Sequence, residues 1–147
     1  MTTIAYNHND RQIAYESRSM RDFVIISDGV NKRIDRDGVS FFLCGSVADY
    51  DMLINMYFGG SEKLVPECNA YAVSKEGCYR IGVTEAGEFW KQKLEHNEAI
   101  GSGWEWAIAA MDFGKSAREA VEYAKTRDSA SGGKVHVFQI GDTNPLT

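Results

Sequence analysis

The feature that most constrains the fold is a tight turn between two strand-like stretches. Asp37-Gly38 lies between residues 32–36 and 39–43. An Asp-Gly pair readily adopts the positive φ angles of a two-residue hairpin turn, which joins adjacent antiparallel strands. Residues 70–74 and 78–83 flank a second short loop in the same way. We therefore expect antiparallel sheets rather than repeated βαβ units.

The rest of the chain supplies further strands and three helices. Strands are expected at residues 12–17, 89–94 and 134–140, and the apolar residues 23–26 are expected to form a buried strand. One helix is expected at residues 47–58, ended by two glycines. A second follows from Trp104, Ala107, Ile108 and Met111, whose spacing is typical of a helix with one buried face.

A third helix is expected after Ser116, because Ser116 and Glu119 have the spacing of a capping box. Small apolar residues at helical spacing follow it. The order of elements is strands, helix, strands, two helices and strand. It favours antiparallel sheets covered by helices.

Composition narrows the class of protein. A chain of 147 residues that is 44% hydrophobic suits one globular domain spanning residues 1–147. The net charge of -5 comes from scattered residues without a basic stripe, which argues against a nucleic-acid partner. No apolar run approaches the roughly 20 residues of a membrane span, and the polar start lacks the regions of a signal peptide. A cytoplasmic protein is expected.

The sequence points to neither a metal nor a cofactor. The three cysteines, Cys44, Cys68 and Cys78, lack metal-ligand spacing and are more simply buried or incidental thiols. A Cys/His nucleophile pair assembled in space ranks far below that interpretation.

Four segments, in order, resemble proteasome β-type and HslV-type subunits of the N-terminal-nucleophile (Ntn) hydrolases. The resemblance implies a four-layer αββα sandwich of two antiparallel sheets, an α+β fold. The stretch at residues 60–67 is too short for one helix of the usual set, which is expected to be missing. The matching segments are Thr2-Thr3-Ile4-Ala5 with Ile13-Ala14-Tyr15-Glu16-Ser17-Arg18, Val30-Asn31-Lys32-Arg33-Ile34, Leu43-Cys44-Gly45-Ser46-Val47-Ala48-Asp49, and Ala99-Ile100-Gly101-Ser102-Gly103 with residues 127–133.

The resemblance implies a threonine peptidase with Thr2 as nucleophile once Met1 is removed. An N-terminal threonine carries its own base, because its free α-amine has a reference pKa of about 8. Lys32 matches the catalytic lysine, and Glu16 stands where the family has aspartate. Gly45 matches the residue whose N–H faces the oxyanion. Ser102, Asp128 and Ser131 match the cluster that fixes the threonine amine.

The resemblance also implies a substrate pocket and an assembly. Val30, Leu43 and Val47 occupy the matched pocket positions, so cleavage after hydrophobic residues is expected. Identical subunits would form a ring, with an ATP-dependent unfoldase as partner and peptides or unfolded proteins as substrates. The thinly covered sheet would bury apolar surface against a neighbour.

Two other functions compete with this one. The chain is a non-catalytic structural subunit if Met1 is retained, because the α-amine is then an amide. It is a small-molecule amidohydrolase if the same nucleophile turns over small amides and no peptides. Taken singly, each matched residue also has a simpler interpretation: Thr2 and Thr3 as the start of an edge strand, Lys32 as a solvated lysine, Glu16 as a surface glutamate, Gly45 as a turn, Ser102 as a helix N-cap, and Asp128 with Ser131 as a helix-end turn.

Overall fold

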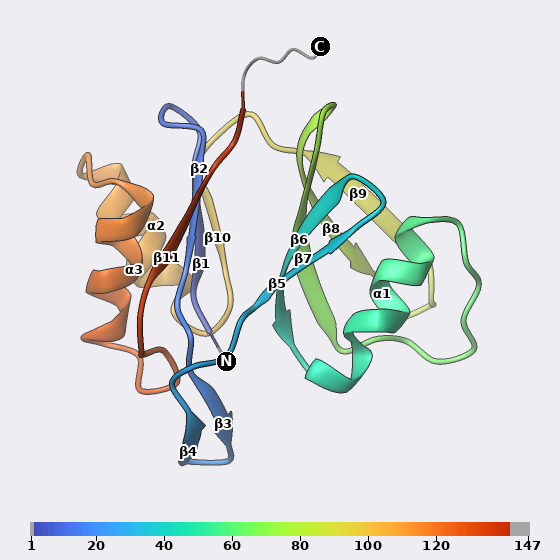
Figure 1. Cartoon of the computed structure of the whole chain (residues 1–147), viewed down its shortest axis with the longest axis horizontal. Helices are drawn as coiled ribbons and strands as arrows, with labels where there is room; N and C mark the ends of the chain where they lie inside the picture. Colours follow the sequence, from blue (N-terminus) through green and yellow to red (C-terminus); the bar gives the residue numbers. More distant parts are fainter. Residues whose placement is uncertain (1, 142–147) are drawn as a thin grey trace. The chain divides into compact units, whose positions relative to one another are not determined.

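The computed structural model describes residues 2–141. They form two compact units (Figure 1). One contains the chain up to Lys32 together with the chain from Glu95 onwards, and the other is Arg33–Leu94. Each unit has an antiparallel sheet with α-helix packed against it. That the two behave as a single domain stays a prediction.

The first unit is built on a four-stranded antiparallel sheet with the order β10-β1-β2-β11. Helices α2 and α3 pack against this sheet (Figure 1). Ala5 pairs with Ala14 on one side and Ala99 on the other, so small side chains meet the helices. The elements are β1 (Ile4–Asn7), β2 (Gln12–Tyr15), β10 (Glu98–Ile100), α2 (Trp104–Asp112), α3 (Ala117–Lys125) and β11 (His136–Gln139).

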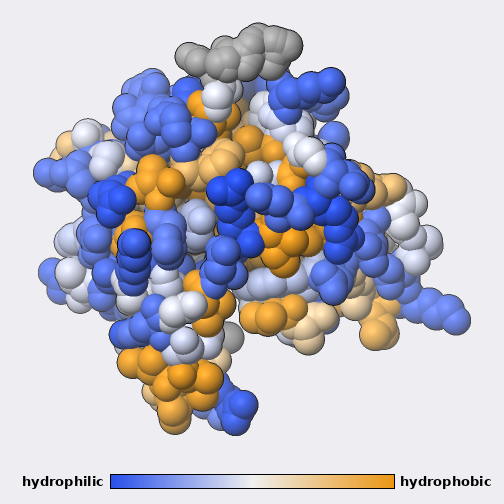
Figure 2. Space-filling model, viewed as in Figure 1, coloured by the Kyte–Doolittle hydropathy of each residue, from blue (hydrophilic) through white to orange (hydrophobic). Residues whose placement is uncertain are grey.

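A separate hairpin, β3 (Ser19–Arg21) and β4 (Val24–Ser27), follows β2 in this unit. The predicted strand at residues 23–26 exists, but its predicted burial is wrong. Phe23 is 95% exposed and Val24 62%, and Figure 2 shows hydrophobic side chains gathered on the hairpin. Continuous apolar runs are typical of strands covered on both faces. Within residues 2–141, β4 pairs with β3 alone.

The second unit is a five-stranded antiparallel sheet in chain order, β5-β6-β7-β8-β9. Asp37 and Gly38 have φ angles of 50° and 81°, which confirms the predicted hairpin turn. Helix α1 packs on the sheet through Leu53 and Ile54. The elements are β5 (Arg33–Arg36), β6 (Val39–Gly45), the 3-10 turn η1 (Val47–Asp49), α1 (Tyr50–Tyr57), β7 (Cys68–Ser74), β8 (Gly77–Val83) and β9 (Phe89–Lys93).

Within residues 2–141, the three α-helices lie where the sequence predicted helices. Residues 60–67 contain no helix, as their length and polarity predicted. Trp104 is 48% exposed, although its spacing predicted a buried face, because Ala107 and Met111 supply the contact of α2 with the sheet. None of the helices within residues 2–141 has both the length and the apolar character needed to cross a membrane.

The predicted capping box begins α3. Ser116 Oγ accepts a hydrogen bond from Glu119 N at 3.1 Å, and Glu119 Oε1 accepts one from Ser116 N at 3.0 Å. The pKa of the Glu119 carboxyl is lowered mainly by its hydrogen bond with the Ser116 backbone and, to a smaller extent, by its hydrogen bond with the Ser116 side chain. The first turn of α3 is thus closed by two reciprocal bonds.

Ser116→Ala is expected to destabilise the protein by about 1 kcal/mol, because it leaves the Glu119 N–H without its cap. Urea unfolding followed by tryptophan fluorescence measures the change. Ser61→Ala, at an exposed serine in the connector after α1, is the matched control and is expected to change the free energy of unfolding by less than about 0.5 kcal/mol. Equal stability of the two variants contradicts the prediction.

Candidate active site

The start of β1 brings three parts of the chain together. Ile4 pairs with Tyr15 of β2 and with Ile100 of β10. Thr2 and Thr3 therefore lie beside the residues that follow those two strands, which include Glu16 and Ser102. Thr2 is only 1% exposed and Thr3 is fully buried.

The Thr2 hydroxyl lies against a buried ion pair. Lys32 Nζ is 2.7 Å from Glu16 Oε1, and the two side chains are 5% and 0% exposed. Lys32 Nζ also donates to Thr2 Oγ1, which in turn donates to Glu16 Oε1. A buried ammonium and carboxylate thus hold the oxygen that would act as nucleophile.

Backbone groups fix the Glu16 carboxylate. Its Oε1 accepts from Thr3 N at 3.2 Å, and its Oε2 accepts from Arg18 N at 3.1 Å and Gly132 N at 3.0 Å. An ionised carboxylate only accepts hydrogen bonds, and here every contact is a donor. The longer arm of glutamate is therefore anchored at both oxygens.

A second network meets the Thr2 backbone nitrogen. Thr2 N donates to Ser102 Oγ at 3.1 Å, and Ser102 Oγ donates to Asp128 Oδ2 at 2.6 Å. Ser131 Oγ donates to the same oxygen at 2.7 Å and lies 2.7 Å from Thr3 Oγ1. A chain of hydrogen bonds thus runs from the Thr2 nitrogen to the Asp128 carboxylate.

The loop after α3 positions Asp128. Asp128 N donates to Ala124 O at 2.8 Å, and Ser131 N donates to Asp128 O at 3.1 Å, so the loop closes directly on the helix end. Asp128 Oδ1 accepts from Ala130 N at 3.2 Å. Ser17 N donates to Gly132 O at 3.0 Å, which ties the far end of the loop to the residue after Glu16.

Two glycines allow this close packing. Gly101 has φ +94°, and a Cβ there would lie 2.2 Å from Thr2 O. A Cβ on Gly103 would lie 2.0 Å from Thr3 Oγ1 and 3.3 Å from Asp128 Oδ2. Only glycine fits both positions without displacing the threonines.

The structure brings together six of the residues chosen from sequence: Thr2, Glu16, Lys32, Ser102, Asp128 and Ser131. The simpler interpretation of Lys32 and Glu16 as surface residues is wrong, because both are buried. Ser102 is exposed and Asp128 half-buried, so the network at the Thr2 nitrogen includes more exposed side chains than the Lys32–Glu16 pair.

The remaining predicted residues are divided between the two units. Gly45, Leu43 and Val47 belong to the second unit. A Cβ on Gly45, which has φ +109°, would lie 2.6 Å from Glu67 O, so glycine is also needed there for the approach of β7. Leu43 is fully buried in the core under α1, whereas Val47 is 64% exposed. Their roles toward a substrate stay predictions.

Val30 lines a pocket of about 330 Å³ in the first unit. Ser17, Asp28, Lys134 and His136 also line it, so its wall combines polar and apolar surface. The apolar substrate pocket expected from Val30, Leu43 and Val47 together stays a prediction.

The cysteines show no sign of a reactive thiolate. Burial raises the pKa of the Cys68 thiol to about 12, so Cys68 is protonated at neutral pH. Cys44 and Cys78 are buried. Within residues 2–141, no three His, Cys, Asp or Glu side chains are grouped as a metal site would require.

Sequence reasoning missed several supporting residues. Thr3 joins the two networks, Gly132 binds the Glu16 carboxylate, and Gly101 makes room for Thr2. Each lies beside a residue that was chosen, and the local signals were the Thr-Thr pair, the Gly-Ser-Gly triplet and the Gly-Gly pair. Their partners are distant in sequence.

The sequence matches no protein-family model and no curated protein. Solved structures do resemble it. BPH from Thiobacillus denitrificans, in complex with epoxomicin, superposes with a TM-score of 0.70 at 18% identity, over 93% of this chain and 97% of that one. Eukaryotic HslV from Trypanosoma brucei gives 0.70 at 18% identity, over 93% and 98%. BPH determined separately gives 0.69 at 17%, over 94% and 96%.

These similarities extend over nearly the whole of each chain, so they concern the complete fold rather than one motif. They confirm the α+β class and the fold resemblance expected from the four segments, with fewer helices than usual. The chain has the fold of the proteasome-like and HslV-like Ntn hydrolases.

Proposed function

We propose that this protein is a threonine-type peptidase whose nucleophile is Thr2, exposed as the N-terminal residue by removal of Met1. The observation that carries the proposal is the pair of networks around one residue. Lys32 and Glu16 hold the Thr2 hydroxyl, while Ser102 and Asp128 hold its nitrogen. A nucleophile needs both an activating base and a fixed orientation.

The α-amine of Thr2 is the proposed base. Its N–H donates to Ser102 Oγ, which leaves the lone pair of the neutral amine available to the hydroxyl proton. Ser102 in turn donates to Asp128, so the hydrogen-bond chain keeps the amine oriented. The amine accepts the proton as Oγ1 attacks and then delivers it to the leaving nitrogen.

Lys32 supplies electrostatic stabilisation. Its ammonium donates to Thr2 Oγ1 and favours negative charge on that oxygen as the proton leaves. Glu16 keeps the ammonium charged and in place, with little competition from water because both groups are buried.

The proposed reaction has two steps, acylation of Thr2 and hydrolysis of the resulting ester. Oγ1 forms a bond to the carbonyl carbon, the C–N bond breaks, and the leaving amine carries away the proton. Water then attacks the resulting ester, giving its proton to the α-amine, and the acid product leaves as Oγ1 regains a proton. The Gly45 N–H is the proposed oxyanion donor, and Val30, Leu43 and Val47 are the proposed pocket residues.

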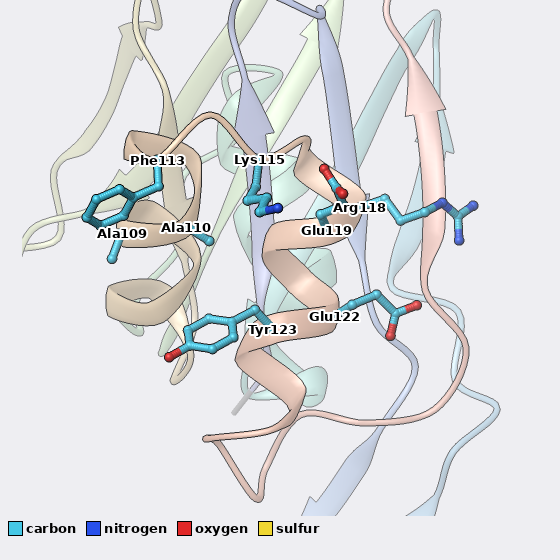
Figure 3. Close-up of a pocket in the computed structure, with 8 residues that line it drawn as sticks. All are labelled: Ala109, Ala110, Phe113, Lys115, Arg118, Glu119, Glu122 and Tyr123. Carbon is cyan, nitrogen blue, oxygen red and sulfur yellow. The ribbon is translucent and has the colours of Figure 1, made fainter.

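We further propose that identical subunits assemble into a ring in the cytoplasm, with peptides or unfolded proteins as substrates and an ATP-dependent unfoldase as partner. Exposed apolar surface supports the assembly. The β3–β4 hairpin exposes Phe23, Val24, Ile25 and Ile26. A hollow of about 520 Å³ between α2 and α3 has apolar walls from Ala109, Ala110, Phe113 and Tyr123 (Figure 3). Surfaces of this kind mark contacts between proteins.

Combining Phe23→Ser with Ile25→Ser is expected to weaken self-association at least about tenfold. Burying one large apolar side chain contributes about 1.5–3 kcal/mol of free energy, and the double substitution removes two of them. Sedimentation velocity over a range of protein concentrations measures the effect. The control combines Leu64→Ser with Val65→Ser, two exposed apolar residues of the connector. Identical association of wild type and hairpin variant rules out a role for the hairpin.

The direct test is incubation with an epoxyketone, followed by intact mass and peptide mapping. BPH from Thiobacillus denitrificans binds epoxomicin, which motivates the choice of probe. One adduct per chain on a Thr2-initiated peptide is expected. Retention of Met1 with neither adduct nor hydrolysis favours the structural subunit. Turnover of a small amide without peptide cleavage favours the amidohydrolase.

A further inference from the structure

Arg18 connects three segments that converge on the proposed nucleophile. Its Nε and Nη2 donate to Asp28 Oδ1 and Oδ2 at 2.8 and 3.1 Å, which closes the base of the β3–β4 hairpin. Its Nη1 donates to Ser129 O at 2.9 Å, inside the loop that carries Asp128 and Ser131. Its backbone N donates to Glu16 Oε2.

The guanidinium also packs on the backbone of the same loop. A Cβ on Gly132 would lie 2.3–2.5 Å from the Arg18 guanidinium atoms, so the group lies against the face that glycine leaves open. Gly132 N is a donor to Glu16 Oε2. Arg18 therefore contacts the loop on both sides of Ser131, at Ser129 and at Gly132.

From this geometry we infer that Arg18 is a positioning residue, which holds the 128–132 loop in register with Glu16 and so aligns the two networks around Thr2. The inference rests on the proposed function. Arg18 touches neither Thr2 nor Lys32 in any hydrogen bond described above, so it acts through Glu16, Ser129 and Gly132. Its side chain is 19% exposed and that of Asp28 43%, which places the clamp at the surface beside the buried site.

The shape of the guanidinium explains why arginine is needed. Two parallel N–H groups bind the Asp28 carboxylate, and a third N–H of the same plane reaches Ser129 O. A lysine ammonium is a point charge without this fork. Lysine is therefore expected to keep an ion pair with Asp28 and to lose the hold on the loop.

The test compares Arg18→Ala and Arg18→Lys with wild type, after intact mass has established the state of the N-terminus. We expect kcat for peptide hydrolysis to fall about 10- to 100-fold in both variants, as misplacement by an ångström does. KM is expected to stay within about twofold, since no substrate contact is removed. Millimolar methylguanidinium is expected to restore part of the activity of Arg18→Ala, which a general loss of stability would not allow.

Amide hydrogen exchange of residues 128–132 gives a readout independent of activity. Faster exchange there in Arg18→Ala supports the inference. Arg36→Ala is the matched control, because Arg36 binds Asn55 and Asp51 within the second unit. It is expected to leave both kcat and this exchange unchanged.

Two failures are distinguishable. If wild type is active and Arg18→Ala is equally active with unchanged exchange, the inference is overturned and the proposed function stands. If wild type neither hydrolyses peptides nor reacts with the epoxyketone, the proposed function fails. In that case, unchanged exchange in Arg18→Ala overturns the role of Arg18 as well, and faster exchange supports its hold on the loop.

Discussion

Thr2→Ala is expected to lower peptide hydrolysis by on the order of 10⁴-fold or more, because it removes the oxygen that Lys32 and Glu16 hold in place for attack. The fold should survive, since the Lys32–Glu16 pair does not depend on the hydroxyl. Initial rates on a peptide with a hydrophobic residue before the cleaved bond measure the loss, and circular dichroism verifies the fold.

Thr2→Ser is the matched control. It keeps the hydroxyl and the α-amine and removes only a methyl group, so measurable hydrolysis and epoxyketone labelling are expected to persist. Wild-type rates in a correctly processed Thr2→Ala protein would show that another residue carries the chemistry.

Lys32→Met is expected to destabilise the folded protein by about 3–5 kcal/mol, the largest effect on stability among these predictions. The substitution keeps much of the side-chain volume but leaves the Glu16 carboxylate buried without its counter-charge. Activity should be lost as well, because Thr2 Oγ1 loses its cationic partner. Urea unfolding at fixed protein concentration, followed by tryptophan fluorescence, gives the free energy of unfolding.

Lys125→Met provides the control for this change. Lys125 forms an exposed pair with Glu122 at 2.9 Å on α3, with side chains 25% and 48% exposed. Pairs of that kind contribute at most about 1 kcal/mol. If the two lysine variants have similar stabilities, the Lys32–Glu16 pair is not the buried, interdependent unit described here.

The two networks divide the proposed work on Thr2. Buried charges act on the hydroxyl, where burial strengthens their effect on the negative charge that develops on Thr2 Oγ1. Neutral hydroxyls and a half-buried carboxylate act on the nitrogen, which must bind and release a proton during each cycle. Thr3 joins the two sides by bonding both Glu16 and Ser131.

Local patterns predicted most elements well. The Asp37-Gly38 turn, the capping box at Ser116 and the stripe of small residues on α3 each depend on neighbours within a few positions, and the structure confirms all three. The strands β3 and β10 were missed, because three residues carry too little periodicity to identify a strand. A strand starting at Thr2 and Thr3 was considered only as an edge strand, whereas β1 lies between β10 and β2.

Burial was predicted less well. The apolar residues of β4 were expected to be buried and are exposed. Hydrophobicity shows that a side chain favours apolar contact, but it does not show whether the partner belongs to the same chain. The polar Glu16 and Lys32 are inside, because each satisfies the charge of the other.

Sequence alone determined the antiparallel character of the sheets, the positions of the helices and, through the family resemblance, which residues to place around Thr2. Only the tertiary structure decided that Lys32 and Glu16 are buried together, that Ser102 and Asp128 meet the Thr2 nitrogen, and that Arg18 holds the loop between them. The physical reason is the separation along the sequence between the residues that interact. Turns and caps arise from bonds between near neighbours, whereas these contacts join residues up to 111 positions apart and exist only once β1 pairs with β2 and β10.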